Sequence, residues 1–222
     1  RAPTSALGGA RYSVLIRPAA GPNRRAKRSR SGAGQLQAAA SKAIKTRFPD
    51  VLVGGPSIGY AGVLADGGLK PTPFLEGFLD HCRRNAAPLD FFSWHRYADD
   101  PFTFVHLARA VRRLLDERGF AKTESHMNEW NYLPGENWTP ILLSGQGSPR
   151  QKCYEEIGGA PGAAFAACAL IFLQDSPVDV ANYYTADHQG FGLFSAYGVP
   201  KKTFFAFKAF KTLLAAPLRV EA

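Results

Sequence analysis

Apolar residues follow two different spacings along the chain, and each spacing predicts a different element. Leu36, Ala40, Ile44 and Phe48 recur every four residues, which is the spacing of one face of a helix that ends at the following proline. The run 51–56 is instead continuous, with three apolar residues followed by two glycines and a proline. Such a run is typical of a short buried strand that ends where helix- and strand-breaking residues begin.

The alternation of helix and strand continues to the C-terminus. Further helices are expected at about 72–82, 101–118, 161–174 and 200–214, further strands at about 90–97, 123–130 and 179–184, and loops over 57–71 and 131–150. Alternation of this kind builds a parallel sheet with right-handed crossover connections. Four parallel strands cannot close a barrel by themselves. The predicted fold class is therefore α/β: a partial (truncated) TIM (β/α)8 barrel with about four to five parallel strands and flanking helices.

Basic residues are concentrated at the N-terminal end. Residues 1–49 hold 11 of the 27 Lys and Arg and none of the 18 Asp and Glu, which leaves 16 basic against 18 acidic side chains for the rest of the chain. We predict a basic, atypical N-terminal segment at 1–34, with one short strand at 12–16, and a partial-barrel catalytic domain at 35–222. A nucleic-acid enzyme more often carries its basic patch on the folded domain, so the basic cluster at 24–30 is interpreted as a solvated arm.

The cysteines and the apolar stretches exclude several other classes. Cys82, Cys153 and Cys168 are an odd number without metal-ligand spacing, so neither a disulfide framework nor a metal site is expected. The stretch 157–174 contains no charged residue and reaches the lower length limit of a membrane span. Its glycines, its alanines and Pro161 favour a buried barrel helix. No signal peptide is recognised at the first residues, and a cytoplasmic location is expected by default.

Polar side chains gather near the ends of two predicted strands. In the first of them, Ser93, His95 and Tyr97 share one face, because side chains alternate along a strand. Glu129 lies near the end of the strand 123–130, just before a Leu-Pro-Gly break. In α/β barrels the chemistry gathers at the carboxyl ends of the strands. The sequence therefore predicts an enzyme with a polar pocket on which Glu129, His95 and Tyr97 converge.

Alternation also predicts which neighbours face away from this pocket. Ser125 and Met127 are expected on the same face as Glu129, whereas Asn128 and Trp130 are expected on the opposite face. On the other strand, Trp94 is expected to pack under helices.

Several stretches together resemble a known enzyme family. They are Ala38-Ala39-Ala40-Ser41-Lys42-Ala43-Ile44-Lys45 with Val53-Gly54-Gly55-Pro56, Phe92-Ser93-Trp94-His95-Arg96-Tyr97, His126-Met127-Asn128-Glu129-Trp130-Asn131, and Phe191-Gly192-Leu193-Phe194 before Gly198-Val199-Pro200-Lys201-Lys202. In this order, the region from about 35 to 214 resembles the C-terminal half of a clan A glycoside hydrolase. It is most similar to family 39, which holds β-xylosidases and α-L-iduronidases. The resemblance implies a (β/α)8 barrel without its first three strands, and retaining hydrolysis of β-xylosides or related plant cell-wall glycosides.

The resemblance also implies roles for individual residues. Glu129 takes the place of the nucleophile, which attacks the anomeric carbon and forms a glycosyl-enzyme. His95 and Tyr97 would bind sugar hydroxyls or orient this carboxylate, and Trp130 would either stack on a sugar ring or pack in the core. The expected substrate-binding residues are Ser93, His95, Tyr97, Trp130, Tyr183, Tyr184 and His188.

The chain departs from the family at the second carboxyl group. The family's acid/base is a Glu in an Asn-Glu-Pro motif at the end of the fourth strand, and no such motif occurs here. Retaining hydrolysis needs a second carboxyl roughly 5–5.5 Å from the first. Glu124 is expected on the wrong face, and Glu155 and Glu156 are expected just before a helix, where its dipole favours negative charge. Glu136, on the loop after Glu129, and Asp187, after the last strand, are equal candidates, and a partner subunit is another source.

Two functions therefore stay open. The first is a retaining glycosidase, and the second is a sugar-binding remnant without turnover, which the missing acid/base favours. A nucleic-acid binder is the weakest alternative, because no motif for base or phosphate recognition occurs in the body of the chain. We expect an oligosaccharide or glycoside substrate, no cofactor, no nucleic-acid partner and no membrane partner. Half a barrel exposes apolar sheet edge and core, so a homo-oligomer, most simply a homodimer, is also expected.

Overall fold

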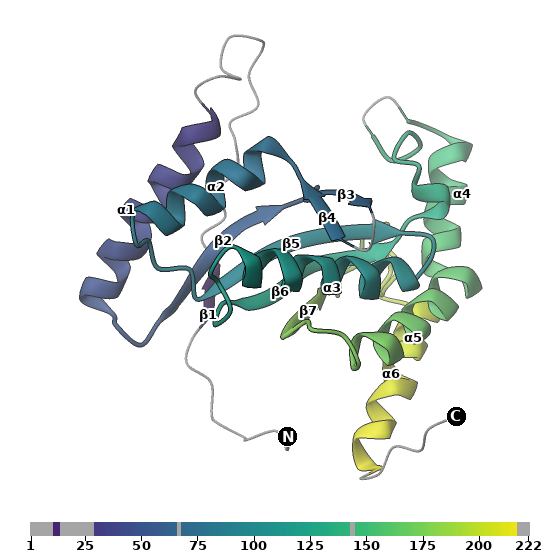
Figure 1. The fold of residues 1–222 in the computed structure, drawn as a ribbon. Helices are drawn as coiled ribbons and strands as arrows, with labels where there is room; N and C mark the ends of the chain where they lie inside the picture. Colours follow the sequence, from purple (N-terminus) through teal and green to yellow (C-terminus); the bar gives the residue numbers. More distant parts are fainter. Residues whose placement is uncertain (1–10, 14–28, 66–67, 143–144, 217–222) are drawn as a thin grey trace. The chain divides into compact units, whose positions relative to one another are not determined.

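The structure is a computed structural model, and it describes residues 11–13, 29–65, 68–142 and 145–216 (Figure 1). The chain divides into two compact units, which are described separately. The first contains residues up to His95 together with Arg109–Asn128, and the second contains Arg96–Ala108 and Glu129–Ala222. The two longest strands each pass from the first unit into the second, and Glu129 is the first residue beyond one of these crossings.

The described strands form a five-stranded sheet and a separate hairpin. The sheet has the order β1-β2-β5-β6-β7, formed by β1 (Arg11–Ser13), β2 (Leu52–Ile58), β5 (Phe91–Ala98), β6 (Glu124–Tyr132) and β7 (Val180–Tyr183). β1 pairs with β2, and β2 with β5, in parallel. Backbone hydrogen bonds join the starts of β5 and β6 (Glu124 N to Asp90 O) and the ends of β6 and β7 (Tyr184 N to Trp130 O), as in a parallel sheet. The predicted partial (β/α)8 architecture is confirmed.

The helices follow the strands in the predicted alternation. They are α1 (Ser29–Arg47), α2 (Pro73–Arg84), α3 (Phe102–Glu117), α4 (Ser148–Gly158), α5 (Ala160–Leu173) and α6 (Lys202–Thr212), with short 3-10 turns η1 (Pro134–Glu136) and η2 (Leu213–Ala215). In the first unit α1 packs beside α2, and in the second unit α5 packs against α6 and α4 (Figure 1). α1 begins earlier than the helix expected from the four-residue spacing, because that spacing marks only the C-terminal part of the helix.

Two segments predicted as loops contain regular structure. The segment after β2 includes the antiparallel hairpin of β3 (Gly62–Ala65) and β4 (Gly68–Pro71), whose short strands lack a clear alternating pattern. α4 occupies the end of the predicted loop 131–150 and the residues beyond it. Glu155 and Glu156 therefore lie inside α4 rather than just before a helix, so the predicted role as helix-start charges is wrong.

The helix expected at 161–174 is the second of two helices that meet at a bend of 43°. Gly159 ends α4 and caps α5, and Pro161 occupies the first turn of α5. A Cβ on Gly162 would lie 1.9 Å from the Ile157 carbonyl oxygen, so only glycine allows this close approach of the two helices. Within the described residues no single helix is long and apolar enough to span a membrane. The bent pair of α4 and α5 together has the length and apolar composition of a broken span.

Sequence patterns account for the packing of α2 in the first unit. Thr72 caps the helix by accepting a hydrogen bond from the Leu75 backbone N–H at 3.2 Å, and Pro73 follows in the first turn, as predicted. Its apolar face, Leu75, Phe78, Leu79 and Cys82, is buried. Burial raises the pKa of the Cys82 thiol to about 12, so it behaves as a small apolar side chain.

One buried hydrogen bond joins β5 and β6 in the first unit. Trp94 Nε1 donates to Ser125 Oγ at 3.0 Å, and neither residue has measurable exposure to solvent. Ser125 therefore lies on the same side of the sheet as Trp94, which corrects the expectation that it shares the pocket face with Glu129. Both side chains are buried, so no water replaces a lost partner.

We expect Trp94→Phe and Ser125→Ala each to lower the free energy of unfolding by about 1–3 kcal/mol, because each leaves a buried polar group without its partner. The double variant is expected to be less destabilised than the sum, with a coupling energy of about 1 kcal/mol. Urea unfolding of the four proteins measures the cycle, and strict additivity would contradict the importance of this bond.

Candidate active site

The centre of the candidate site is a hydrogen bond between the ends of β5 and β6. The Tyr97 hydroxyl donates to Glu129 Oε1, and both side chains are partly buried within the second unit. This confirms that two of the three residues expected to converge lie together. A partly buried carboxylate loses hydration, so a donor aimed at one of its oxygens both orients it and offsets that loss.

The surroundings keep Tyr97 in its protonated, donating form. Burial raises the pKa of Tyr97 most, and the hydrogen bond and negative charge of Glu129 raise it further. The nearby phenols of Tyr183 and Tyr184 act in the same direction. Tyr97 therefore remains a hydrogen-bond donor at pH values at which an exposed tyrosine ionises.

Aromatic rings surround this pair, and one of them was missed by sequence reasoning. Trp138 and Phe191 contact the Tyr97 ring edge-on, with ring centroids 4.8 Å and 5.4 Å away. Phe191 is buried, whereas Trp138 is 39% exposed and offers part of its surface to a ligand. The sequence could have indicated Trp138, because it lies in a polar loop just after the strand that carries Glu129. Such a loop has no hydrophobic core of its own in which a tryptophan side chain is buried.

Trp130 belongs to the core and not to the ligand surface. It is 1% exposed, and its ring packs against Phe104, Tyr183 and Phe207 at centroid distances of 5.7, 5.1 and 6.1 Å. A ring enclosed in this way has no face left for a sugar. The sugar-stacking alternative for Trp130 is therefore corrected in favour of core packing.

The two tyrosines at the end of β7 have different environments. Tyr183 lies between Trp130 and Phe207, and burial raises its pKa to about 12. Tyr184 is 37% exposed, and its carbonyl accepts a hydrogen bond from Asn131 Nδ2. The same amide donates to the Phe191 carbonyl at 3.1 Å. The buried Asn131 therefore ties the segment after β7 to β6, a positioning role that sequence reasoning missed.

Glu136, the first acid/base candidate, forms an ion pair. Arg96 Nη2 lies 2.5 Å from one of its carboxylate oxygens and 2.6 Å from the other. Both oxygens therefore accept hydrogen bonds from the Arg96 guanidinium. A general acid must place its carboxyl against the leaving group, whereas this ion pair holds the Glu136 carboxylate on Arg96.

Asp187, the second candidate, is also held as an anion. Desolvation raises the pKa of Asp187, but hydrogen bonds from Gln189 and the charges of His188 and Lys201 outweigh it, so its pKa lies below the ordinary value. The Gln189 backbone N–H donates to Asp187 Oδ1 at 3.1 Å, and the Gln189 side chain donates to Oδ2. His188 is exposed.

The first unit holds a polar cluster that corrects one predicted face. Asn128 Nδ2 donates to Ser57 Oγ at 3.1 Å, and Ser57 Oγ lies 3.3 Å from Ser93 Oγ. Asn128 was expected on the packing face, but its partners place it with Ser93. β2 also has a register shift between Pro56 and Ile58, with Ser57 at φ 54°, a feature that strand alternation does not reveal.

His95 also belongs to the first unit and is partly buried. That His95 and Ser93 bind the same substrate as Glu129 stays a prediction. The described residues contain no group of three or more His, Cys, Asp and Glu arranged to hold a metal ion.

Comparison with known proteins links this geometry to glycoside hydrolases. The chain is 27% identical over 207 residues to a β-xylosidase of Caldicellulosiruptor saccharolyticus and 26% identical over 210 residues to one of Geobacillus stearothermophilus. These matches cover 82% and 81% of this chain but only 37% and 36% of the relatives. Over this region the chain is similar to β-xylosidases. No protein-family model matches the sequence.

Solved structures agree with this relationship at the level of the fold. A glucosidase from Croceicoccus marinus is 30% identical, with a TM-score of 0.64 over 82% of this chain and 36% of its own. A family 39 β-xylosidase from Caulobacter crescentus is 22% identical, with a TM-score of 0.54 over 81% of this chain and 37% of its own. The chain thus spans about a third of the length of its relatives.

The raised pKa of Tyr97 predicts how stability depends on pH. Above about pH 10 the unfolded chain loses the phenolic proton while the folded protein keeps it, so the free energy of unfolding falls as the pH rises. One such tyrosine contributes a slope of up to about 1.4 kcal/mol per pH unit. Tyr97→Phe is expected to reduce that slope, measured by urea unfolding between pH 9 and 11. An unchanged slope would contradict the buried, donating state of Tyr97.

Proposed function

We propose that this chain is the part of a retaining β-glycosidase that carries the nucleophile, Glu129, and that the substrates are β-xylosides or related plant cell-wall glycosides. The observation that carries this proposal is the Tyr97–Glu129 hydrogen bond at the end of β6, in a chain related to β-xylosidases. The donor on Oε1 fixes the direction in which the Glu129 carboxylate faces. Orientation of a nucleophilic carboxylate by a fixed donor is how such a group is prepared for reaction.

In the proposed reaction a carboxylate oxygen of Glu129 attacks the anomeric carbon, and the bond from that carbon to the leaving-group oxygen breaks. The glycosyl-enzyme is then hydrolysed by water, which restores the carboxylate. Tyr97 donates to Oε1 throughout and keeps the carboxylate in one rotamer. Trp138, beside Tyr97, supplies an exposed ring on which a sugar packs.

A second carboxyl must protonate the leaving group, and neither candidate favours this step. Glu136 is paired with Arg96, and Asp187 has a lowered pKa. These two observations favour the alternative proposal, a carbohydrate-binding remnant with weak or no turnover. They also direct the first experiment to leaving groups that need no protonation.

Aryl β-xylosides with acidic phenols as leaving groups separate the two carboxyls, because such groups depart without acid assistance. We expect slow turnover by the wild-type chain and a loss of at least about 10³-fold in kcat for Glu129→Gln, which keeps shape but removes the nucleophile. Glu124→Gln, on the same strand but at its start, is the matched control and is expected to retain activity. Equal rates for Glu129→Gln and wild type would exclude Glu129 as nucleophile. Absence of turnover in both, with sugar binding retained, would favour the remnant.

Trp138→Ala is expected to raise KM, or the Kd for xylobiose, by about 2–10-fold with little change in kcat, because it removes a sugar-packing surface and no reacting group. Tyr197→Ala removes a ring that is 94% exposed and serves as the control. A fall in kcat with unchanged KM would instead mean that Trp138 acts through Tyr97 and Glu129.

A further inference from the structure

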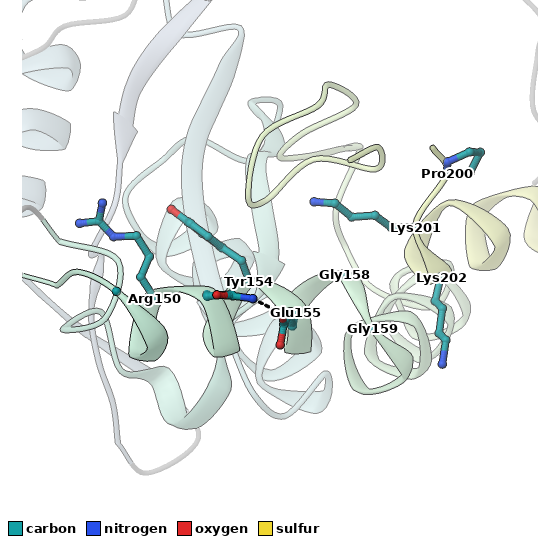
Figure 2. A pocket seen from close by; sticks show the side chains of 10 residues that line it. Arg150, Tyr154, Glu155, Gly158, Gly159, Pro200, Lys201 and Lys202 are labelled. Carbon is teal, nitrogen blue, oxygen red and sulfur yellow. Dashed lines mark hydrogen bonds between the residues drawn. The ribbon is translucent and has the colours of Figure 1, made fainter. Parts of the chain in front are cut away.

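A groove in the second unit lies outside the candidate active site. Its volume is about 700 Å³, and α4 and the start of α6 supply most of its lining (Figure 2). The lining residues are Gly147, Arg150, Gln151, Tyr154, Glu155, Gly158, Gly159, Pro200, Lys201 and Lys202. Glu129 and Tyr97 are absent from this set. The volume falls within the range of about 300–1,000 Å³ that small-molecule sites occupy.

The charged groups of this α4–α6 groove are predominantly cationic. Arg150, Lys201 and Lys202 line it against a single acidic residue, Glu155. The Glu155 carboxylate accepts a hydrogen bond from Gln151 Nε2 at 2.7 Å, which engages one of its oxygens. The groove therefore offers positive charge to a ligand, although residues 50–222 as a whole carry slightly more acidic than basic side chains.

Both inner cations keep hydrogen-bond donors beyond those that hold them in place. Lys201 Nζ donates to the carbonyls of Gln189 and Gly190 at 2.8 and 3.1 Å, and an ammonium has three donors. Arg150 donates through Nε to the Pro140 carbonyl at 3.3 Å and through Nη2 to the Leu142 carbonyl at 2.7 Å, and a guanidinium has five donors. Carbonyl partners, which carry no net charge, fix these side chains, and Asp187 is an anion close enough to interact with Lys201.

Two glycines hold the groove in shape. A Cβ on Gly158 would lie 2.6 Å from Lys201 Cδ, and a Cβ on Gly190 would lie 2.3 Å from Tyr154 Cε1. Lys201 therefore packs directly against the backbone of Gly158, and Tyr154 against the backbone of Gly190. A side chain at either glycine would occupy the same space. Figure 2 shows Tyr154 rising from α4 and Lys201 reaching into the same space from the start of α6. A preorganised cation beside a fixed aromatic ring lowers the entropy cost of binding.

We propose that the α4–α6 groove binds the acidic sugar of an oligosaccharide, with its carboxylate or sulfate on Lys201 and its ring against Tyr154, while Arg150, on the other side of Tyr154 in Figure 2, adds positive charge to the groove. The charge of the lining selects an anion, and the aromatic ring beside it selects a ligand with an apolar face, as a pyranose has. The choice of a sugar rests on the proposed function. The groove also adjoins the candidate site, because Phe191 contacts both Tyr154 and Tyr97, at 5.9 and 5.4 Å.

Calorimetry on the full chain tests this site with three probes: xylotriose, xylotriose bearing a glucuronic acid, and sulfated xylotriose. At least one acidic probe is expected to bind about 10-fold tighter than xylotriose, and the difference should shrink as salt is added. Preference for the glucuronate or for the sulfate identifies which anion the groove takes. Equal affinity for all three probes, or no binding, would overturn the proposal.

Substitutions in the lining test whether the preference for acidic probes comes from the groove. Lys201→Gln and Arg150→Gln are each expected to reduce the acidic preference about 3–10-fold while leaving xylotriose affinity unchanged. Lys208→Gln, an exposed lysine of α6 outside the groove, is the matched control. Lys202→Gln, at an exposed position of the lining, supplies a further variant if either inner substitution impairs folding. A preference that survives the groove substitutions would overturn the assignment, whereas aryl-xyloside turnover tests the catalytic proposal independently.

Discussion

A carboxylate placed among aromatic rings is stable only when a donor offsets its lost hydration, and the hydrogen bond from Tyr97 to Glu129 meets that requirement. Parallel strand order makes the bond available, because it brings the carboxyl ends of β5 and β6 to one edge of the sheet. Burial and the charge of Glu129 keep the phenol protonated. Trp138 and Phe191 then enclose the phenol ring from the side. Phe191 in turn contacts Tyr154 and Tyr184, so one aromatic cluster of the second unit extends from this pair.

The same electrostatics separate Glu129 from the other carboxylates near it. Glu136 is bound by a guanidinium and Asp187 by a glutamine side chain, a backbone N–H and nearby cations. Two carboxyls in a retaining site must differ in protonation, one ionised and one protonated. The carboxylates of Glu129, Glu136 and Asp187 all accept hydrogen bonds. The chain spans about a third of the length of its relatives, so the whole reaction of those enzymes is a proposal for this chain.

The basic side chains that line a groove are not in the part of the sequence where basic residues are most concentrated. The N-terminal residues carry much of the positive charge of the sequence, yet three of the cations outside them line the groove between α4 and α6. Lys201 and Arg150 are held there by loop carbonyls, and Gly158 and Gly190 leave room for the packing. Local backbone geometry, more than net charge, therefore determines where an anion finds donors.

The sequence by itself determined the alternation of elements, the parallel partial barrel and the position of Glu129 at a strand end. Those features follow from apolar spacing and breaker residues, which act over short distances along the chain. Only the tertiary structure decided that Asn128 faces Ser93, that Trp130 is buried, and that Arg96 binds Glu136. The first is shown by the hydrogen bond from Asn128 to Ser57, and the others depend on where loops and distant helices pack. Such contacts join residues far apart in sequence, so spacing along one strand cannot specify them.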